Sequence, residues 1–404
     1  MRRVCLNLRH MKEPSTTQLM VGTPVTHLDF VDALRGWAIL GVIAYHLEGH
    51  FGATVGPLRV FMAQGWRGVQ LFFVVSAFTL MRSMHERALL HPQPTGAFLI
   101  RRFFRIAPMF YFGIALYAYW YGGIVRPEAP NGVTPPTLVK TLLLVHGWQP
   151  DTINAAVPGG WSIGVEAMFY LLLPLIFKFV RSLGQALVLF MAACLMERFF
   201  TRPEVLGWIC PSWTTPRLEY ALDVFRHCWL PAQLPVFACG VLLYFLLEKE
   251  QTKNLKAFAW AALVGGVILA FDQTILVSSQ VVIAVGYLLL GWGLSHRPVA
   301  LVVNPLTRYI GKVSFSIYVL HFAVIEVVCA WLGLDRMGDL PHLGGLPSAS
   351  WTIAKSSEPV KALVSFAIVL MAVVPLSALT YRWIEAPGQA LGSRVSKLIF
   401  GGSR

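Results

Sequence analysis

The first long apolar segment of the chain carries two ionisable side chains, Arg35 and His46. Ionisable groups are costly in hydrocarbon, so two of them on one apolar segment indicate a functional site. On a helix they would lie roughly 16 Å apart along the axis, about half the hydrocarbon thickness of a bilayer. An imidazole can accept a proton from a hydroxyl near neutral pH. His46 is therefore a candidate general base, and the alternative is an interfacial histidine that only hydrogen-bonds a loop.

Three arginines are candidates for binding an anion. Arg102 and Arg105 share one face of a helix, because they are three residues apart, and two guanidinium groups together form a fork suited to phosphate. Contact with anionic lipid explains the same pair and is the commoner case. Arg35 likewise either binds a buried partner or reaches lipid phosphates from a helix end.

A carboxylate and a second histidine occur in two later apolar segments. Glu166 lies about one and a half turns into the segment that opens at Gly160, at a depth similar to that of His46. It could orient His46, as the third member of a catalytic triad does, or form a salt bridge with an arginine. His321 lies in mid-segment, where a histidine more often bonds a neighbouring helix than performs chemistry. We treat His321 as a candidate for lining a pore.

The elements that must position these groups are membrane helices. Of the 404 residues, 56% are hydrophobic and 13% are charged, and the mean hydropathy is +0.61. These values are typical of polytopic membrane proteins. The formal net charge of +13 is spread over short clusters between apolar runs, which fits the positive-inside rule and not nucleic-acid binding. The six cysteines show no CxxC pair and no metal-ligand spacing, and Cys210 and Cys228 could bridge or stay unpaired.

The hydropathy pattern predicts an all-α bundle of about ten transmembrane helices. A stretch at 138–145 is too short to span and is expected at the interface or as a re-entrant piece. The expected spans lie at about 30–48, 68–84, 106–124, 161–179, 183–197, 229–247, 257–271, 274–294, 314–334 and 360–381.

The basic loops predict the orientation of the bundle. They alternate onto one side of the membrane, which places both termini in the cytoplasm. Residues 1–28 and 389–404 are then cytoplasmic tails, and 29–388 form one membrane domain. The loops at 198–226 and 335–358 lie outside. The first helix runs outward, so Arg35 belongs to the cytoplasmic half and His46 to the outer end.

Several segments in order resemble the membrane-bound acyltransferase family 3, bacterial enzymes that O-acylate cell-surface and secreted glycans. The resemblance runs over about residues 28–388. Two positions depart from it: Ala77 replaces a usual glycine, and Ala167 replaces a common second glutamate, which leaves Glu166 as the only acid of its motif. The similar pieces are Leu34-Arg35-Gly36 with His46, residues 68–76, Arg102 with Arg105, Trp161-Ser162 with Glu166 and Phe169-Tyr170, Gln233-Leu234-Pro235 with Phe237 and Gly240, Ser316-Ile317-Tyr318 with His321, and residues 381–387.

The resemblance implies helices around a polar cavity in the inner membrane of a bacterium, with no metal. It implies an acyl-CoA donor, acetyl-CoA by default, whose phosphates Arg102 and Arg105 would hold while Arg35 lines the path to His46. The acceptor would be a hydroxyl of a carbohydrate or glycolipid, deprotonated by His46 with Glu166 beside it. The expected pore-lining residues are Ser76, Trp161, Ser162, Tyr318 and His321.

Two alternatives stay open at the level of sequence. An acyl-enzyme on Ser76, Ser162 or His46 would divide the transfer into two steps. A transporter or flippase of a glycan or anionic metabolite would also need charges inside the membrane, although we find no internal repeat of the kind common in transporters. The oligomeric state and the acceptor are not predicted.

Overall fold

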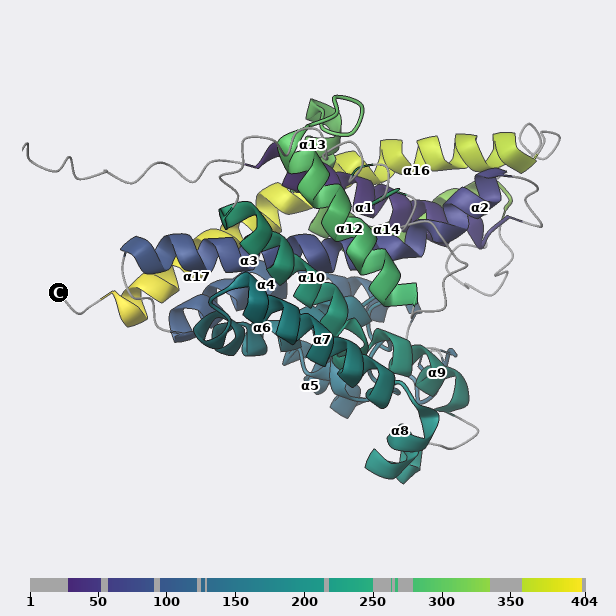
Figure 1. The fold of residues 1–404 in the computed structure, drawn as a ribbon. Helices are drawn as coiled ribbons and strands as arrows, with labels where there is room; N and C mark the ends of the chain where they lie inside the picture. Colours follow the sequence, from purple (N-terminus) through teal and green to yellow (C-terminus); the bar gives the residue numbers. More distant parts are fainter. Residues whose placement is uncertain are drawn as a thin grey trace, which may run out of the picture.

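The computed structural model describes residues 28–51, 57–90, 95–121, 125–127, 129–213, 218–249, 263, 266–267, 279–334 and 358–401. Within these ranges the regular structure is helical, as predicted, and the helices form one bundle (Figure 1). The predicted span at 257–271 lies almost wholly outside the described residues, as do most of the first tail and of the loop at 335–358.

The helices differ widely in length, from one-turn pieces to long rods. Short 3₁₀ turns occur at Gln64–Arg67, His146–Trp148 and Pro211–Trp213. The helices are α1 (Asp29–Glu48), α2 (Pro57–Ala63), α3 (Gly68–Leu90), α4 (Thr95–Tyr121), α5 (Pro135–Leu142), α6 (Trp161–Phe179), α7 (Leu183–Phe200), α8 (Pro203–Ile209), α9 (Glu219–Cys228), α10 (Leu230–Lys249), α12 (Ser279–His296), α13 (Pro305–Lys312), α14 (Ser314–Trp331), α16 (Glu358–Thr380) and α17 (Ala386–Phe400).

Six helical stretches in the described part of the chain are long and apolar enough to cross a membrane. The protein is therefore a multi-pass membrane protein. Two further long helices, α3 with 23 residues and α4 with 27, belong to the same bundle. The count of about ten spans and the cytoplasmic termini stay predictions. The six stretches are Asp29–Glu48, Trp161–Phe179, Leu183–Phe200, Glu219–Glu248, Ser314–Trp331 and Pro359–Phe400.

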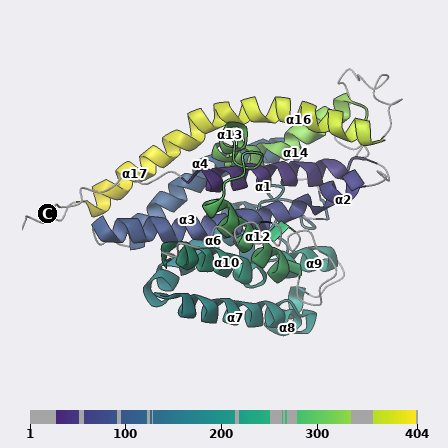
Figure 2. The same cartoon turned by 45° about the horizontal axis from the view of Figure 1, so that its top comes forward.

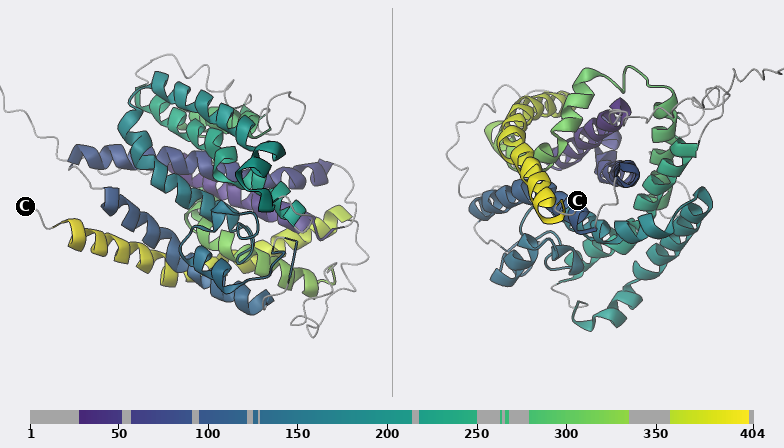
Figure 3. Two further views of the ribbon diagram at one scale, coloured as in Figure 1. Left: turned by 90° about the horizontal axis from the view of Figure 1, so that it is seen from below. Right: turned by 90° about the vertical axis from the view of Figure 1, so that its left-hand side faces the viewer.

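Helix α1 lies inside the bundle and packs against α3, α13 and α14. Helix α10 packs between α3 and α7, and α7 forms one outer layer with α8 (Figure 2). Viewed along its length, the bundle is a ring of helices (Figure 3, right).

The crossing of α1 and α13 depends on two glycines. A Cβ on Gly36 would overlap the backbone oxygen of Thr307, and one on Gly311 would overlap that of Asp32. These two glycines therefore permit the close approach of α1 and α13. Asn304 fixes the start of α13, because its side chain accepts hydrogen bonds from two backbone N–H groups of the first turn.

The last helix does not end near residue 381, the end of the span expected at 360–381. A π-helical turn, Tyr381–Glu385, joins α16 directly to α17, and the two form a long continuous rod in Figure 2. Pro387 is compatible with this arrangement because it lies just after the π-helical turn, where the regular ladder of α-helical hydrogen bonds is already interrupted. Much of the predicted tail at 389–404 is thus helix packed on α4.

Candidate active site

A polar cavity of about 220 Å³ lies between α1, α3, α4, α6, α14 and the rod of α16 and α17. Charged groups in such a setting are expensive, so their collection around one cavity indicates function. The cavity is lined by the cations Arg35, Arg102, Arg105 and Lys312 and by the carboxylates Asp32, Glu166 and Glu385.

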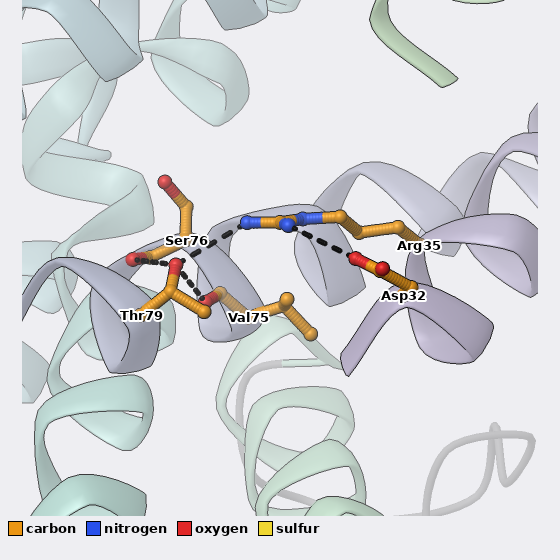
Figure 4. Close-up of polar contacts among 5 residues, drawn as sticks. All are labelled: Asp32, Arg35, Val75, Ser76 and Thr79. Carbon is orange, nitrogen blue, oxygen red and sulfur yellow. Dashed lines mark hydrogen bonds and ion pairs between the residues drawn. The ribbon is translucent and has the colours of Figure 1, made fainter. Parts of the chain in front are cut away.

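Arg35 is held in the cavity by one group on its own helix and one on a neighbouring helix. Its Nη1 lies 3.6 Å from Asp32 Oδ1 on α1, and its Nη2 donates to Thr79 Oγ1 on α3 at 3.2 Å (Figure 4). Thr79 in turn donates to the backbone oxygens of Val75 and Ser76 at 2.9 and 3.0 Å. The side chain of Arg35 is 23% exposed. Of the two predicted alternatives, the structure shows Arg35 partly buried and paired with groups inside the protein.

Glu166 receives two hydrogen bonds at one oxygen. Ser76 Oγ donates to Oε1 at 2.5 Å and the Tyr170 hydroxyl donates to the same atom at 2.8 Å. Tyr170 follows Glu166 by four residues, so both side chains lie on one face of α6. This cluster ties α6 to α3 at the cavity wall.

Arg102 and Arg105 both line the cavity from α4, as their spacing predicts for one helix face. The Nε of Arg102 is buried and makes no hydrogen bond within the described chain. Its guanidinium carbon lies 5.6 Å from the ring centre of Phe98. A buried donor without an acceptor is costly, so this group fits an anionic ligand.

Tyr318 and Ser162 form a hydrogen-bonded wall on another side of the cavity. Ser162 Oγ donates to the Tyr318 hydroxyl at 2.8 Å, and that hydroxyl donates to the Gly159 backbone oxygen at 2.9 Å. Ser162 is 5% exposed and Tyr318 is 6% exposed. Their side chains are therefore fixed in place between α6 and α14.

His46 and His321 lie next to this wall but are not among the residues that line the cavity. His46 Nδ1 is 3.0 Å from the Val42 backbone oxygen and 3.2 Å from His321 Nε2. His321 Nδ1 is 2.6 Å from the Tyr318 backbone oxygen. The ring of Phe322 packs against His46 with 4.3 Å between centres. The histidine pair thus adjoins the cavity through the backbone of Tyr318.

The structure brings seven of the ten predicted site residues to the cavity. Glu166 is bonded to Ser76 and Tyr170, whereas His46 is bonded to His321, so the predicted contact between Glu166 and His46 is not formed. The seven residues are Arg35, Ser76, Arg102, Arg105, Ser162, Glu166 and Tyr318, and the three outside are His46, His321 and Trp161, whose ring contacts the cavity residue Phe73.

Sequence reasoning missed several cavity residues. Tyr170 belongs to a motif that resembles the family and lies four residues after Glu166, but it was not assigned to the site. Asp32 was signalled only by its position three residues before Arg35. Nothing in the sequence singled out Thr79 or Lys312.

No cluster of three or more His, Cys, Asp or Glu side chains suited to a metal occurs in the described ranges. Cys210 and Cys228, which could have bridged, are free thiols.

The protein is a helical membrane bundle with arginines and a hydrogen-bonded carboxylate around one cavity and a histidine pair next to it. It belongs to the class of membrane proteins with an internal polar site. The family model described as an acyltransferase domain matches residues 28–382. The chain belongs to the membrane-bound acyltransferase family 3 and is an O-acyltransferase, as the sequence motifs predicted.

Two curated relatives agree with this assignment. The chain is 26% identical over 357 residues to acyltransferase MdmB of Streptomyces mycarofaciens, covering 82% of this chain and 88% of the relative. It is also 26% identical over 164 residues to O-acetyltransferase OatA of Staphylococcus aureus, covering 38% of this chain and 25% of the relative. No solved structure matches the chain.

Proposed function

We propose that the protein moves an acyl group, acetyl by default, from acyl-CoA to a hydroxyl of a cell-envelope or secreted carbohydrate or glycolipid. The observation that carries the proposal is the cavity itself. Predicted donor-binding arginines from two helices line it together with the hydrogen-bonded carboxylate of Glu166, and the histidine pair lies next to the cavity. The name of OatA includes O-acetyltransferase, which supports both the acetyl group and an oxygen acceptor.

Arg102 and Arg105 are the proposed holders of the CoA phosphates. The buried Nε of Arg102 lacks an acceptor, and guanidinium groups bind phosphate oxygens with two parallel hydrogen bonds. Arg35, already turned toward α3 by Thr79, lines the route of the pantetheine arm. The donor would enter from the cytoplasm, and the protein would reside in the bacterial inner membrane with about ten spans and both termini inside.

His46 is the proposed general base. It takes the proton of the acceptor hydroxyl while the hydroxyl oxygen bonds to the thioester carbonyl carbon. The resulting tetrahedral intermediate collapses and its carbon–sulfur bond breaks. His46 returns the proton to the departing CoA sulfur. The product is an ester and free CoA.

Glu166 is proposed to hold Ser76 and Tyr170 and to balance the charge of the arginines, because these are the groups it meets. The bond from Ser76 to Glu166 also makes Ser76 the best-placed hydroxyl for the alternative acyl-enzyme route, with Glu166 as its proton acceptor.

Transfer from radiolabelled acyl-CoA by the purified protein in proteoliposomes tests this proposal. We expect label in envelope carbohydrate or glycolipid extracted from bacteria, and slow hydrolysis of acyl-CoA without acceptor. Arg102→Ala should raise KM for acyl-CoA by roughly ten-fold or more, because hydrogen bonds to charged groups contribute about 1.5–3 kcal/mol. Arg181→Ala, a change at a loop arginine outside the cavity, is the matched control. The absence of both transfer and hydrolysis with every acyl-CoA from acetyl to palmitoyl would refute the proposal.

A further inference from the structure

The two histidines of the pair come from helices far apart in the sequence. His46 lies near the end of α1 and is partly exposed, whereas His321 lies within α14 and is 0% exposed. Their nearest nitrogens, His46 Nδ1 and His321 Nε2, are 3.2 Å apart. This distance is that of a hydrogen bond, so one nitrogen carries a proton and the other accepts it.

The backbone determines which nitrogen of His321 carries its proton. A carbonyl oxygen can only accept, and the Tyr318 oxygen lies 2.6 Å from His321 Nδ1. The proton of a neutral His321 therefore resides on Nδ1 and is donated to Tyr318. Its Nε2 is then a bare acceptor directed at His46.

The same reasoning fixes the tautomer of His46. Its Nδ1 faces two acceptors, the Val42 backbone oxygen at 3.0 Å and His321 Nε2. A neutral imidazole, which a general base must be at the start, carries one proton, and only Nδ1 offers it partners. The lone pair is left on Nε2, to which no group in the described ranges is hydrogen-bonded.

We propose that His321 is a positioning residue that, together with the Val42 backbone oxygen, holds the ring of His46 with Nδ1 protonated and Nε2 bare. The inference rests on the proposed role of His46 as the base. In it, His46 Nδ1 shares its proton between the Val42 backbone oxygen and His321 Nε2, and His321 is itself fixed on the Tyr318 backbone. The second acceptor sets the orientation of the imidazole ring of the base. Oriented partners of this kind support the base of many hydrolytic and acyl-transfer sites.

The surroundings of His321 allow a matched pair of substitutions. Its ring packs against Phe322 and Tyr318, with ring centres 4.2 and 5.5 Å away. His321→Phe keeps an aromatic ring at this position and removes the acceptor. His321→Gln keeps an acceptor, because its amide oxygen can reach the position of Nε2.

Steady-state kinetics of the purified wild type, His321→Phe, His321→Gln and His46→Ala tests the inference. We expect His321→Phe to lower kcat by about 10–100-fold, the usual cost of losing an orienting partner, with KM for acyl-CoA changed less than about two-fold. His321→Gln should recover most of kcat. Loss of kcat to the same degree in both His321 variants, or wild-type kcat in His321→Phe, would overturn the inference.

The His46→Ala variant separates this result from the proposed function. If it is inactive while His321→Phe has wild-type kcat, the positioning role fails and the role of His46 stands. If it is fully active, the proposed base itself is wrong. Nitrogen NMR of histidine-labelled wild type in nanodiscs gives an answer even where a His321 variant does not fold. The His46 signals, assigned by their loss in His46→Ala, should show a protonated Nδ1 and a bare Nε2, and the opposite tautomer would overturn the inference.

Discussion

The strength of the two hydrogen bonds at Glu166 Oε1 can be measured, because it depends on the charge of the carboxylate. Ser76 and Tyr170 donate to this oxygen at 2.5 and 2.8 Å. A hydrogen bond to a charged group contributes about 1.5–3 kcal/mol, and one between neutral groups about 0.5–1.5 kcal/mol. Glu166→Gln keeps an acceptor oxygen and removes the charge, so each bond should weaken by about 1 kcal/mol.

A double-mutant cycle isolates this quantity from the changed solvation of the carboxylate. Glu166→Gln and Tyr170→Phe are made singly and together, and the free energy of unfolding is measured by denaturant titration in mixed detergent micelles. We expect a coupling free energy of about 1 kcal/mol between residues 166 and 170, and a similar value with Ser76→Ala.

The control for this cycle is a tyrosine whose hydrogen bond goes elsewhere. Tyr111 donates to the Leu142 backbone oxygen at 2.6 Å, so Tyr111→Phe and Glu166→Gln should be additive. Coupling below about 0.3 kcal/mol in both the Tyr170 and the Ser76 cycle would refute the cluster at Glu166.

Two further predictions concern stability. Gly36→Val should lower the free energy of unfolding by about 1–3 kcal/mol or prevent folding, because its side chain meets the backbone of α13. Gly184→Val, whose Cβ would meet nothing nearer than the Ser182 hydroxyl at 4.0 Å, should not. Equal losses in the two variants would contradict the close crossing. Burial lowers the pKa of His146, in the connection between α4 and α6, to about 4. The unfolded chain then binds a proton that the folded chain does not, so stability should fall by about 3 kcal/mol as the pH drops from about 6.5 to about 4. His146→Gln should remove this pH dependence of the unfolding free energy, and an unchanged dependence would contradict it.

The cavity groups that were predictable from sequence are those that are unusual in an apolar segment. Arg35, Glu166 and the arginine pair on α4 stand out because charge is rare in hydrocarbon, and helix periodicity alone places Arg102 and Arg105 on one face. Thr79 is an ordinary residue for a helix, so its contact with Arg35 follows only from the packing of α1 against α3.

The pairings between distant segments were not predictable in the same way. His46 and His321 are separated by 275 residues, and equal depth suggested Glu166 as the partner of His46 instead. Depth along the membrane normal does not determine which helices are neighbours, and α14 rather than α6 presents its side chain to His46. The expected span at 360–381 ends where the apolar run ends, whereas the helix continues through a π-helical turn into α17, which hydropathy does not indicate.

The transfer rate of His46→Ala tests the central claim most directly. The variant is compared with wild type and with His50→Ala, a change at a nearby histidine outside the cavity and the histidine pair, in proteoliposomes with radiolabelled acetyl-CoA and an accepting glycan. All three proteins are first shown to be folded to the same extent in detergent. We predict that His46→Ala loses transfer by about 100-fold or more, the usual contribution of a general base, while His50→Ala keeps it. Undiminished transfer in folded His46→Ala would contradict the account.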